Sequence, residues 1–385
     1  MKVLFTIEQL DYADHIAIAY LSAIAKRLGH KTFFCLANSL SSEVIRLRPD
    51  VVAYSANVMS FPALVKSHRH ASSIHKFTSI MGGPQCTFSP ETFTESGVDA
   101  YCIGEGDYAF RDFLVQVSEG LPFDNVPNLI TERSHNPVRP LIQNLDELPP
   151  PDRDLTLADS YLRSEPKKTL YSSRGCPFSC AYCCNSYYHD LYRGKGPLVR
   201  RFSVDRIIAE ANHIQSRYRM DFVKFEDDCF ALKVDDWLLE FTEKYSKLVR
   251  VPFNCYLRLD TIDMPLLALL KEAGCFSVHL SIDSTSEHVR EHVLHRHGRG
   301  DTQELIDKLQ LIGRYGINTW VNYMLAAPES TVQDDLATIR VSKRGQVTYA
   351  AYSTTVPMKG TPLYDYALAN SMIDLSSHRS DMTGC

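Results

Sequence analysis

No stretch of this 385-residue sequence approaches the roughly 20 consecutive apolar residues that a membrane-spanning helix needs. The first apolar stretch is also too short for the core of a secretory signal, and acidic residues follow it at once. No basic block stands out, and the 46 acidic residues outnumber the 41 Lys and Arg, so the net charge is −5. This balance argues against a nucleic-acid surface. We therefore expect a cytoplasmic protein without a membrane or nucleic-acid partner.

The sequence also lacks the dense set of cysteines that a secreted disulfide framework would show. Its eleven cysteines are an odd number, and most stand singly inside apolar runs, which favours a reducing compartment. The exception is a group of four within residues 176–184. That group requires a separate explanation.

Short apolar runs alternate with helical patterns through residues 1–146, which predicts an α/β fold with an open, doubly wound (Rossmann-like) sheet. We expect helices over residues 15–28, from about 62, and over 107–118, and a hairpin formed by NLIT and RPLIQ. The expected strands are KVLFTI, KTFFCLA, VVAYSA, TSIMGG and AYCIG.

Residues 147–167 include a proline triplet and are predicted to be a linker. Residues 168–370 then show a second alternation, which predicts a partial (β/α)6 barrel with chemistry at the carboxyl ends of its strands. Helical patterns include 204–218, 264–273 and 302–315. Residues 371–385 are interpreted as a polar tail, with truncation of the chain as one alternative. The expected strands are KKTLYSS, DFVKFED, FNCYLR, SVHLSID, NTWVNYML and QVTYAAYS.

The cysteine group has the spacing Cys176-x3-Cys180-x2-Cys183 directly after the first strand of the barrel. Three thiolates on one loop can each bind one iron of a 4Fe–4S cluster, which leaves the fourth iron open to a substrate. A zinc site would need a fourth ligand, which leaves Cys184 or His189 as candidates. We expect the adjacent Cys184 side chain to diverge from Cys183.

The CxxxCxxC spacing, with the aromatic Tyr182 before the third cysteine, resembles the radical S-adenosylmethionine (radical SAM) superfamily. The resemblance implies that the open iron chelates the methionine moiety of SAM and that an electron from the cluster releases a 5′-deoxyadenosyl radical. It also implies an electron donor of the flavodoxin or ferredoxin type.

Further segments resemble this superfamily at the expected strand ends. The resemblance implies that Glu226, Asp227 and Asp228 contact the methionine amine; an acidic strand end facing water is the alternative. Arg258 is expected to pair with the methionine carboxylate, or to form an ordinary surface ion pair.

Ser281 and Asp283 match a ribose-contacting GIESGSE segment, although Asp replaces Glu. The run NYMLAAPEST resembles an adenine-contacting GLPGET segment. In this chain Ala326 or Ala327 replaces the first glycine of that segment, and Glu329 replaces the second. The run PMKGTPLYDYA resembles a structural PGTPLY segment.

The N-terminal region resembles the cobalamin-binding domain that precedes many radical SAM barrels, in VVAYSAN, IMGGPQCTFSPETF and GVDAYCIGEGDYAFRDFL. No DxHxxG signature is present, so the resemblance implies cobalt without a protein His ligand. An open sheet binds its ligand at the carboxyl ends of its strands. The candidate contacts on those loops are Ser55, Gly82, Gly83, Pro84, Glu105 and Gly106.

The resemblance implies a radical SAM enzyme, foremost a cobalamin-dependent methyltransferase acting on an unactivated carbon or phosphorus. A cobalamin-independent radical enzyme that catalyses hydrogen abstraction, rearrangement or cyclisation is the second hypothesis. A non-enzymatic iron–sulfur or zinc protein is the third. The residues leave the substrate open as a small molecule or a peptide.

Overall fold

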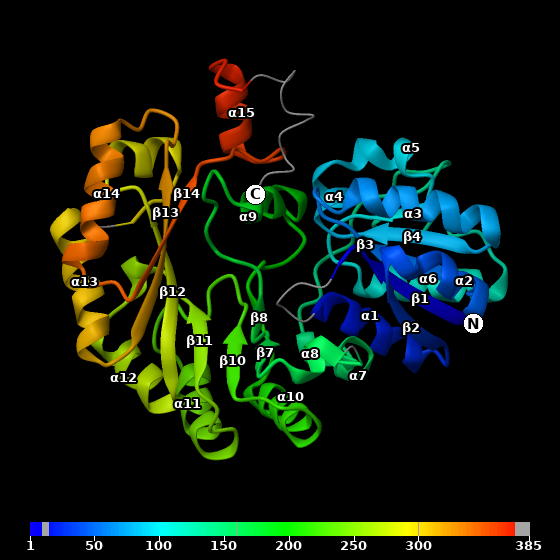
Figure 1. Cartoon of the computed structure of the whole chain (residues 1–385), viewed down its shortest axis with the longest axis horizontal. Helices are drawn as coiled ribbons and strands as arrows, with labels where there is room; N and C mark the ends of the chain where they lie inside the picture. Colours follow the sequence, from blue (N-terminus) through cyan, green and yellow to red (C-terminus); the bar gives the residue numbers. More distant parts are fainter. Residues whose placement is uncertain (10–14, 159, 299, 374–385) are drawn as a thin grey trace.

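The computed structural model describes residues 1–9, 15–158, 160–298 and 300–373, so most of the predicted tail lies outside the described residues. Two parallel sheets lie side by side, one in each half of the chain (Figure 1). Helices flank both sheets, and the α/β class is confirmed. Within the described residues, no helix combines the length and apolar character that crossing a membrane requires.

The first sheet has the order β2-β1-β3-β4-β5-β6, and all pairs but the last are parallel. All five predicted strands are present, and the strand order reverses beside β1, as in a doubly wound sheet. Its strands are β1 (Lys2–Ile7), β2 (Lys31–Leu36), β3 (Val51–Ser55), β4 (Thr78–Gly82), β5 (Ala100–Cys102) and β6 (Leu129–Ile130). Its helices are α1 (Ile16–Arg27), α2 (Leu40–Leu47), α3 (Phe61–Ile74), α4 (Pro84–Phe88), α5 (Phe93–Ser96) and α6 (Asp107–Glu119).

The predicted hairpin forms with a different second half. Its first half is β6, which pairs with β5 and also folds back on residues 134–137 through an antiparallel bridge between Ile130 and His135, whereas residues 139–143 are not a strand. Pro140 has no backbone N–H to donate to a ladder, and the Leu141 N–H donates to Lys195 O at 2.9 Å. This segment therefore joins the other half of the chain instead of folding back on β6.

The second sheet has the order β14-β13-β12-β11-β10-β7 and is parallel throughout, which confirms the partial (β/α)6 barrel. Its strands are β7 (Lys167–Leu170), β10 (Phe222–Phe225), β11 (Phe253–Tyr256), β12 (Cys275–Asp283), β13 (Asn318–Leu325) and β14 (Tyr349–Thr354). The covering helices are α10 (Val204–Arg217), α11 (Asp236–Leu248), α12 (Met264–Ala273), α13 (Thr302–Arg314) and α14 (Val332–Arg344).

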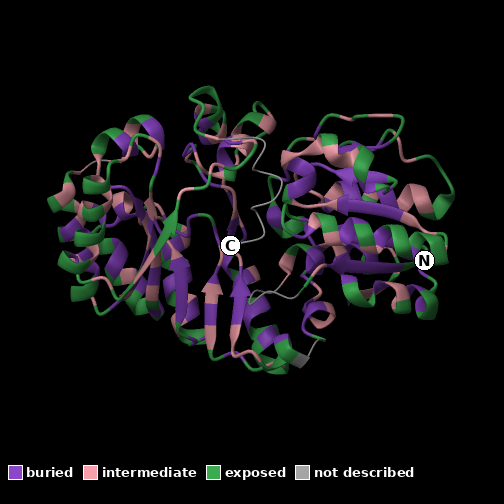
Figure 2. Cartoon of the chain, turned by 45° about the horizontal axis from the view of Figure 1, so that its top comes forward, coloured by how far each residue is buried: buried purple, intermediate pink, exposed green. Residues whose placement is uncertain are grey.

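Side chains alternate across this sheet, as the pleat requires. Val223, Phe253, Val278 and Val321 are completely buried in the core cluster beneath the helices. Their neighbours along each strand point to the inside of the barrel. Figure 2 shows the resulting buried strands, and it shows the edge strand β14 as mostly exposed.

Shorter elements connect and cap the two sheets. The linker carries α7 (Arg153–Thr156) and α8 (Ser160–Ser164), and a small antiparallel pair is formed by β8 (Ser173–Arg174) and β9 (Arg200–Arg201). Helix α9 (Cys184–Leu191) follows the cysteine group, and α15 (Pro362–Ala369) lies above it in Figure 1. The single turns are η1 (Ala37–Ser39), η2 (Pro90–Thr92), η3 (Leu145–Glu147), η4 (Leu259–Thr261) and the π-helical η5 (Val289–Val293).

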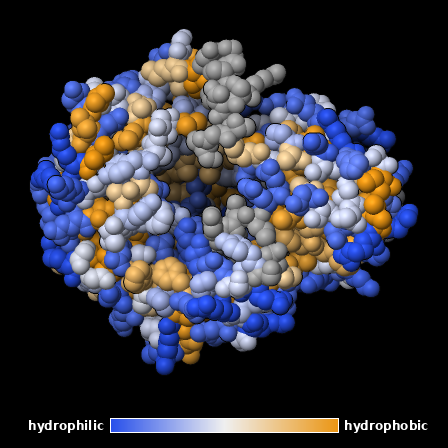
Figure 3. All heavy atoms as spheres, in the orientation of Figure 1, coloured by the Kyte–Doolittle hydropathy of each residue, from blue (hydrophilic) through white to orange (hydrophobic). Residues whose placement is uncertain are grey.

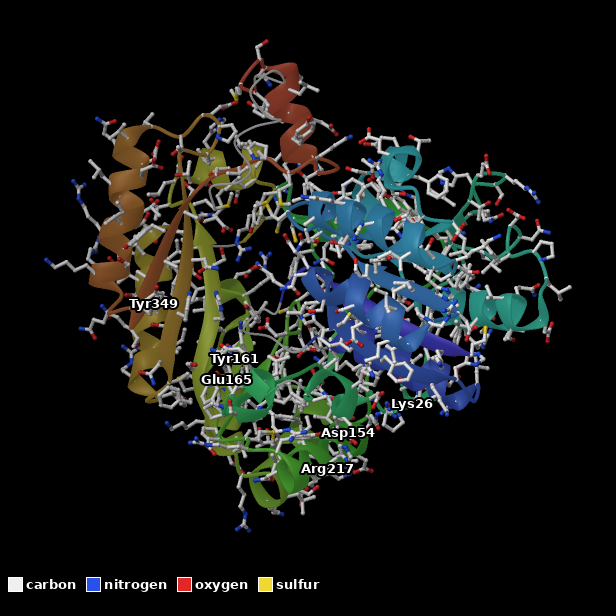
Figure 4. The ribbon with its side chains drawn as sticks, turned by 45° about the vertical axis from the view of Figure 1, so that its right-hand side comes forward. Lys26, Asp154, Tyr161, Glu165, Arg217 and Tyr349 are labelled. Carbon is white, nitrogen blue, oxygen red and sulfur yellow. The ribbon has the colours of Figure 1, made fainter. Side chains whose placement is uncertain are left out.

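The linker is attached to the barrel by a buried ion pair. Arg153 is 1% exposed and donates to Glu210 of α10 at 2.9 Å and to Thr169 O of β7 at 2.7 Å. Asp154 and Arg217, labelled in Figure 4, form a second and more exposed pair at 3.1 Å. Burial makes the first pair the stronger structural constraint.

Substitution of Arg153→Met should lower the free energy of unfolding by about 3–5 kcal/mol, because it leaves the Glu210 carboxylate buried without its partner. Denaturant unfolding of the purified protein measures this change. The double substitution Arg153→Met with Glu210→Leu should recover much of the loss, because no unpaired charge remains. Equal instability of the single and double variants would contradict the ion-pair explanation.

Candidate active site

The three cysteines lie on the loop between β8 and α9. Cys176 and Cys180 are buried and Cys183 is partly buried. The Ala181 N–H donates to Leu294 O at 2.8 Å, and Ala181 O accepts from the Leu363 N–H at 2.9 Å. The loop is thus held between the segment after β12 and the start of α15. This second contact involves PMKGTPLYDYA, the segment predicted to be structural.

Positive and polar groups face the thiols. The Arg258 Nη1 and Arg296 Nη1 atoms lie 3.7 Å and 4.0 Å from the Cys180 sulfur. Asn185 Nδ2 lies 3.7 Å from the Cys183 sulfur. Two guanidinium groups and an amide donor stabilise negative charge on sulfur. This donor set fits a cluster held by thiolates.

The prediction that Cys183 and Cys184 diverge is wrong. Their thiols hydrogen-bond to each other, and this contact lowers the pKa of Cys183 to about 6. Within the part of the chain that the structure describes, no three His, Cys, Asp or Glu side chains converge as ligands of one metal ion.

The three acids that end β10 have different surroundings. Glu226 pairs with Lys224 at 2.6 Å, and Asp228 accepts hydrogen bonds from Asn185 and the Gly175 backbone. Asp227 is 1% exposed, and its Oδ1 accepts from the Ser172 N–H at 2.9 Å. The other oxygen, Oδ2, is buried and has no partner among the described residues. Burial raises the pKa of Asp227 to about 6, although hydrogen bonds from the adjacent serines oppose the shift.

Arg258 is not an ordinary surface residue, because it is 6% exposed. Two of its nitrogens pair with Asp260, each at 2.9 Å, and Nη2 also donates to His297 O. Its guanidinium lies 3.7 Å from the centre of the Phe178 ring, inside the cysteine loop. The alternative of an ordinary ion pair thus holds for the pairing, with Asp260, but not for the exposure, because the guanidinium is buried.

A buried network joins the cysteine loop to β12. The Tyr182 hydroxyl donates to Asp283 at 2.7 Å, and Arg296 Nε pairs with the same carboxylate at 2.8 Å. Arg296 also donates to the Tyr182 hydroxyl and to Ser281 O. The Ser281 hydroxyl hydrogen-bonds to Asp283, so the two predicted ribose contacts touch each other.

Three non-glycine residues in the predicted SAM-contacting segments have left-handed backbones. Asp283 has φ 65°, and Ala326 and Glu329 have φ 55° and 62°. Glycine adopts such angles at no steric cost. Ala326 and Glu329 thus adopt backbone angles that glycine takes freely, at a cost of about 1–2 kcal/mol each.

A cavity of about 350 Å³ lies at the carboxyl ends of the first sheet. Ser55, Gly82, Gly83, Glu105 and Gly106 line it, whereas Pro84, which begins α4, does not. Tyr171, Arg174 and Phe202 close it from the barrel side. Figure 3 shows the surface hollowed between the two halves. The lining is mostly apolar, which suits a large organic cofactor.

The two halves are joined beside this cavity by ion pairs from Arg174 and Arg200 to Glu105 and Asp107. Arg200 Nη1 donates to Glu105 at 3.0 Å, so Glu105 is bound to the barrel. Arg174 holds Asp107 through two contacts of 2.7 Å and 3.1 Å. Burial alone would raise the pKa of Asp107, but the Arg174 charge holds it below its usual value. Asp107 is thus an ionised structural partner of Arg174.

Sequence reasoning did not identify Arg174, Arg200 or Arg296 as residues of this region. Arg174 precedes Gly175 in the cysteine loop, so its position beside the motif was a usable signal. Arg296 lies among histidines and a second arginine in a polar stretch without family-like residues. Only the fold brings Arg296 to the cluster loop.

Two family models match this chain. The family model of the radical SAM superfamily matches residues 170–337, and that of the B12 binding domain matches residues 8–114. An uncharacterized methyltransferase of Pyrococcus horikoshii is 28% identical over 93% of this chain and 79% of its own length. The anaerobic magnesium-protoporphyrin IX monomethyl ester cyclase of Rubrivivax gelatinosus is 24% identical over 70% of this chain, which spans 52% of the cyclase.

The solved structure of the radical SAM methyltransferase TsrM of Kitasatospora setae, with cobalamin and a [4Fe-4S] cluster bound, superposes on this fold with a TM-score of 0.78. The two sequences are 15% identical, and the match covers 96% of this chain and 74% of TsrM. The cobalamin-dependent radical enzyme OxsB has a TM-score of 0.71 at 19% identity, over 96% and 55% of the two chains. At these identities the likeness shows the shared fold. With both family models matched in the same order along that fold, the chain belongs to the radical SAM enzymes that carry a cobalamin-binding domain.

Proposed function

We propose that this enzyme is a methyltransferase that uses both cofactors on an unactivated carbon or phosphorus. The observation that carries the proposal is the contact between the two sites. Arg174 lines the cavity of the first sheet, and Cys176 begins the cysteine loop only two residues later. One substrate placed between the halves can therefore reach both cofactors. The methyltransferase of Pyrococcus horikoshii, similar over most of the chain, supports the reaction class.

When bound, a 4Fe–4S cluster reductively cleaves SAM to generate the hydrogen-abstracting radical, and methylcobalamin supplies the methyl group. Cys176, Cys180 and Cys183 would hold the cluster. Arg258 and Arg296 would offset its negative charge through the contacts to Cys180. The chain itself orients the cofactors and limits the access of water.

Asp227 is the acid that we assign to the methionine ammonium group. Its buried Oδ2 has no partner within the described ranges, whereas Glu226 is already paired with Lys224. A buried carboxylate oxygen is costly unless a donor satisfies it, and an ammonium group supplies such a donor. Asp228 is hydrogen-bonded to Asn185 and would support the cysteine loop.

The remaining predicted contacts surround the same position. Arg258 would pair with the methionine carboxylate while Asp260 keeps its guanidinium in place. Ser281 and Asp283 would bind the ribose, and Tyr182 would fix Asp283 through its hydroxyl. For cobalamin, Ser55, Gly82, Gly83 and Gly106 offer a cavity wall with little side-chain bulk. Glu105 would support the cavity through its ion pair with Arg200, and Pro84 would support it by beginning α4.

Substitution of Asp227→Asn should weaken SAM binding about 10- to 100-fold, because a hydrogen bond to a charged group contributes on the order of 1.5–3 kcal/mol. The amide keeps an oxygen for the serine donors but carries no charge for the ammonium group. Equilibrium dialysis with SAM measures the change, with the iron content as a check on the cluster. Glu226→Gln should bind SAM as the wild type does. Equal effects of the two substitutions would contradict the assignment.

The proposed function is tested by anaerobic purification and reconstitution with iron, sulfide and hydroxocobalamin. About four irons, one corrin and 5′-deoxyadenosine formation under reduction are expected. Iron and SAM cleavage without any bound corrin would contradict the methyltransferase and favour a cobalamin-independent radical enzyme.

The proposal includes a cytoplasmic location, because the cluster requires a reducing environment and a low-potential electron donor. A flavodoxin or ferredoxin would supply the electron. We propose a small molecule as the substrate rather than a nucleic acid, which agrees with the net charge of −5.

A further inference from the structure

The side-chain amide of Asn185 lies between the cysteine loop and the end of β10. Its Nδ2 atom is 3.7 Å from the Cys183 sulfur, and the same amide hydrogen-bonds to the Asp228 carboxylate. Asn185 belongs to the first turn of α9, which begins directly after Cys183. The Cys184 thiol also contacts this sulfur, but an S–H group is a weak donor. The amide is therefore the stronger side-chain donor to Cys183.

Asp228 fixes which end of the amide faces the sulfur. A carboxylate accepts hydrogen bonds, whereas the Asn amide donates only through Nδ2, which carries two hydrogens. The hydrogen bond to Asp228 therefore holds Nδ2 on the side where the Cys183 sulfur lies. Asp228 also accepts from the Gly175 backbone at the start of the cysteine loop. One carboxylate thus holds both ends of that loop and orients the amide donor.

The surroundings of Asn185 differ from those of the arginines near Cys180. Asn185 is 5% exposed, and a hydrogen bond is stronger when water is excluded from it. Arg258 and Arg296 lie near the Cys180 sulfur, but each is paired with a carboxylate of its own. Those carboxylates offset the guanidinium charge. The neutral amide therefore has an effect on Cys183 that can be removed without changing any charge.

We propose that Asn185, oriented by Asp228, sets the reduction potential of the 4Fe–4S cluster. Reduction adds one negative charge that the sulfur ligands share, and a hydrogen bond to sulfur stabilises this charge. The amide therefore favours the reduced form and raises the potential. One electron from the flavodoxin- or ferredoxin-type donor is transferred in this step, and Asn185 neither gains nor loses a proton. The inference rests on the proposed function, because it requires that Cys183 bind the cluster.

The test measures the midpoint potential of the cluster in the full chain after anaerobic reconstitution, by a redox titration followed by electron paramagnetic resonance. Asn185→Leu preserves the size of the side chain but removes the donor. It should disfavour reduction about tenfold, which corresponds to a potential about 59 mV lower for a one-electron couple. Asn185→Gln should stay close to the wild-type potential, because it retains the amide. A cavity of about 170 Å³ borders Asn185 and gives room for the longer side chain.

Ser186→Ala is the matched control. Ser186 follows Asn185, is 6% exposed, and donates to the carbonyl oxygen of Cys183 at 2.7 Å. The control thus removes a buried hydrogen bond to the same cysteine but not to its sulfur, and the potential should not change. The resonance signal comes only from molecules that hold a reduced cluster. Partial loss of iron in a variant therefore does not alter the measured potential.

An unchanged potential in Asn185→Leu, an equal shift in Ser186→Ala, or a shift in Asn185→Gln as large as that in Asn185→Leu would overturn the inference. The titration needs neither corrin nor substrate, which keeps the two proposals separate. The expected shift in a chain that binds no corrin supports the role of Asn185 while the methyltransferase fails. An unchanged potential in a chain that binds corrin and cleaves SAM refutes the role of Asn185 and leaves the proposed function intact.

Discussion

Replacement of Cys176, Cys180 or Cys183 by Ala should reduce both the iron content and 5′-deoxyadenosine formation to background. Each thiolate is expected to bind a different iron, so no other side chain substitutes for a lost ligand. The loop should still fold, because Ala181 is fixed by backbone hydrogen bonds to Leu294 and Leu363 that need no thiol. Iron analysis and product chromatography after anaerobic reconstitution measure the two quantities.

Cys184→Ala is the matched control, one residue away from a proposed ligand. It removes the thiol that hydrogen-bonds to Cys183 but no ligand of the cluster. We expect nearly full iron content and SAM cleavage at a rate close to that of the wild type. A loss of iron as complete as that of Cys183→Ala would show that Cys184 is a ligand and would reopen the zinc or alternative-cluster hypotheses.

The strands were predictable because parallel strands covered on both faces leave short, continuous apolar runs in the sequence. VVAYSA and TSIMGG are such runs, and they became β3 and β4. The cysteine loop was predictable because its spacing is local. The position of the second half of the hairpin was not predictable. Leu141 of the expected strand hydrogen-bonds to Lys195, more than fifty residues away, and no local pattern records that contact.

The site was predictable as a set of strand ends but not as a set of contacts. The sequence places Glu226, Asp227 and Asp228 together, yet only the fold shows that Asp227 alone of the three has a buried oxygen without a partner in the described ranges. Arg258 likewise became informative through its burial against Phe178. Three-dimensional surroundings, which decide the solvation and charge of a side chain, are not encoded by spacing.

Substitution of Ala17→Trp should weaken cobalamin binding about 10- to 100-fold. Ala17 is exposed on α1 and lines the cavity of about 350 Å³ at the carboxyl ends of the first sheet. A large ring there fills space that the cofactor needs, and overpacking typically costs about 1–3 kcal/mol. The fold should be preserved, because the new side chain replaces an exposed methyl group. The absorbance of bound corrin after gel filtration measures the effect.

Two controls make this result specific. Ala17→Ser adds little volume and should retain cobalamin, and Ile45→Trp places the same ring on α2, where Ile45 is 63% exposed away from the cavity. SAM cleavage by the barrel should persist in Ala17→Trp, since Cys176 and its loop are untouched, while methyl transfer should fall with the corrin content. Undiminished corrin binding in Ala17→Trp would place the cofactor elsewhere. Loss of SAM cleavage together with the corrin would mean that the first half of the chain also shapes the cluster site, through pairs such as Arg174 with Asp107.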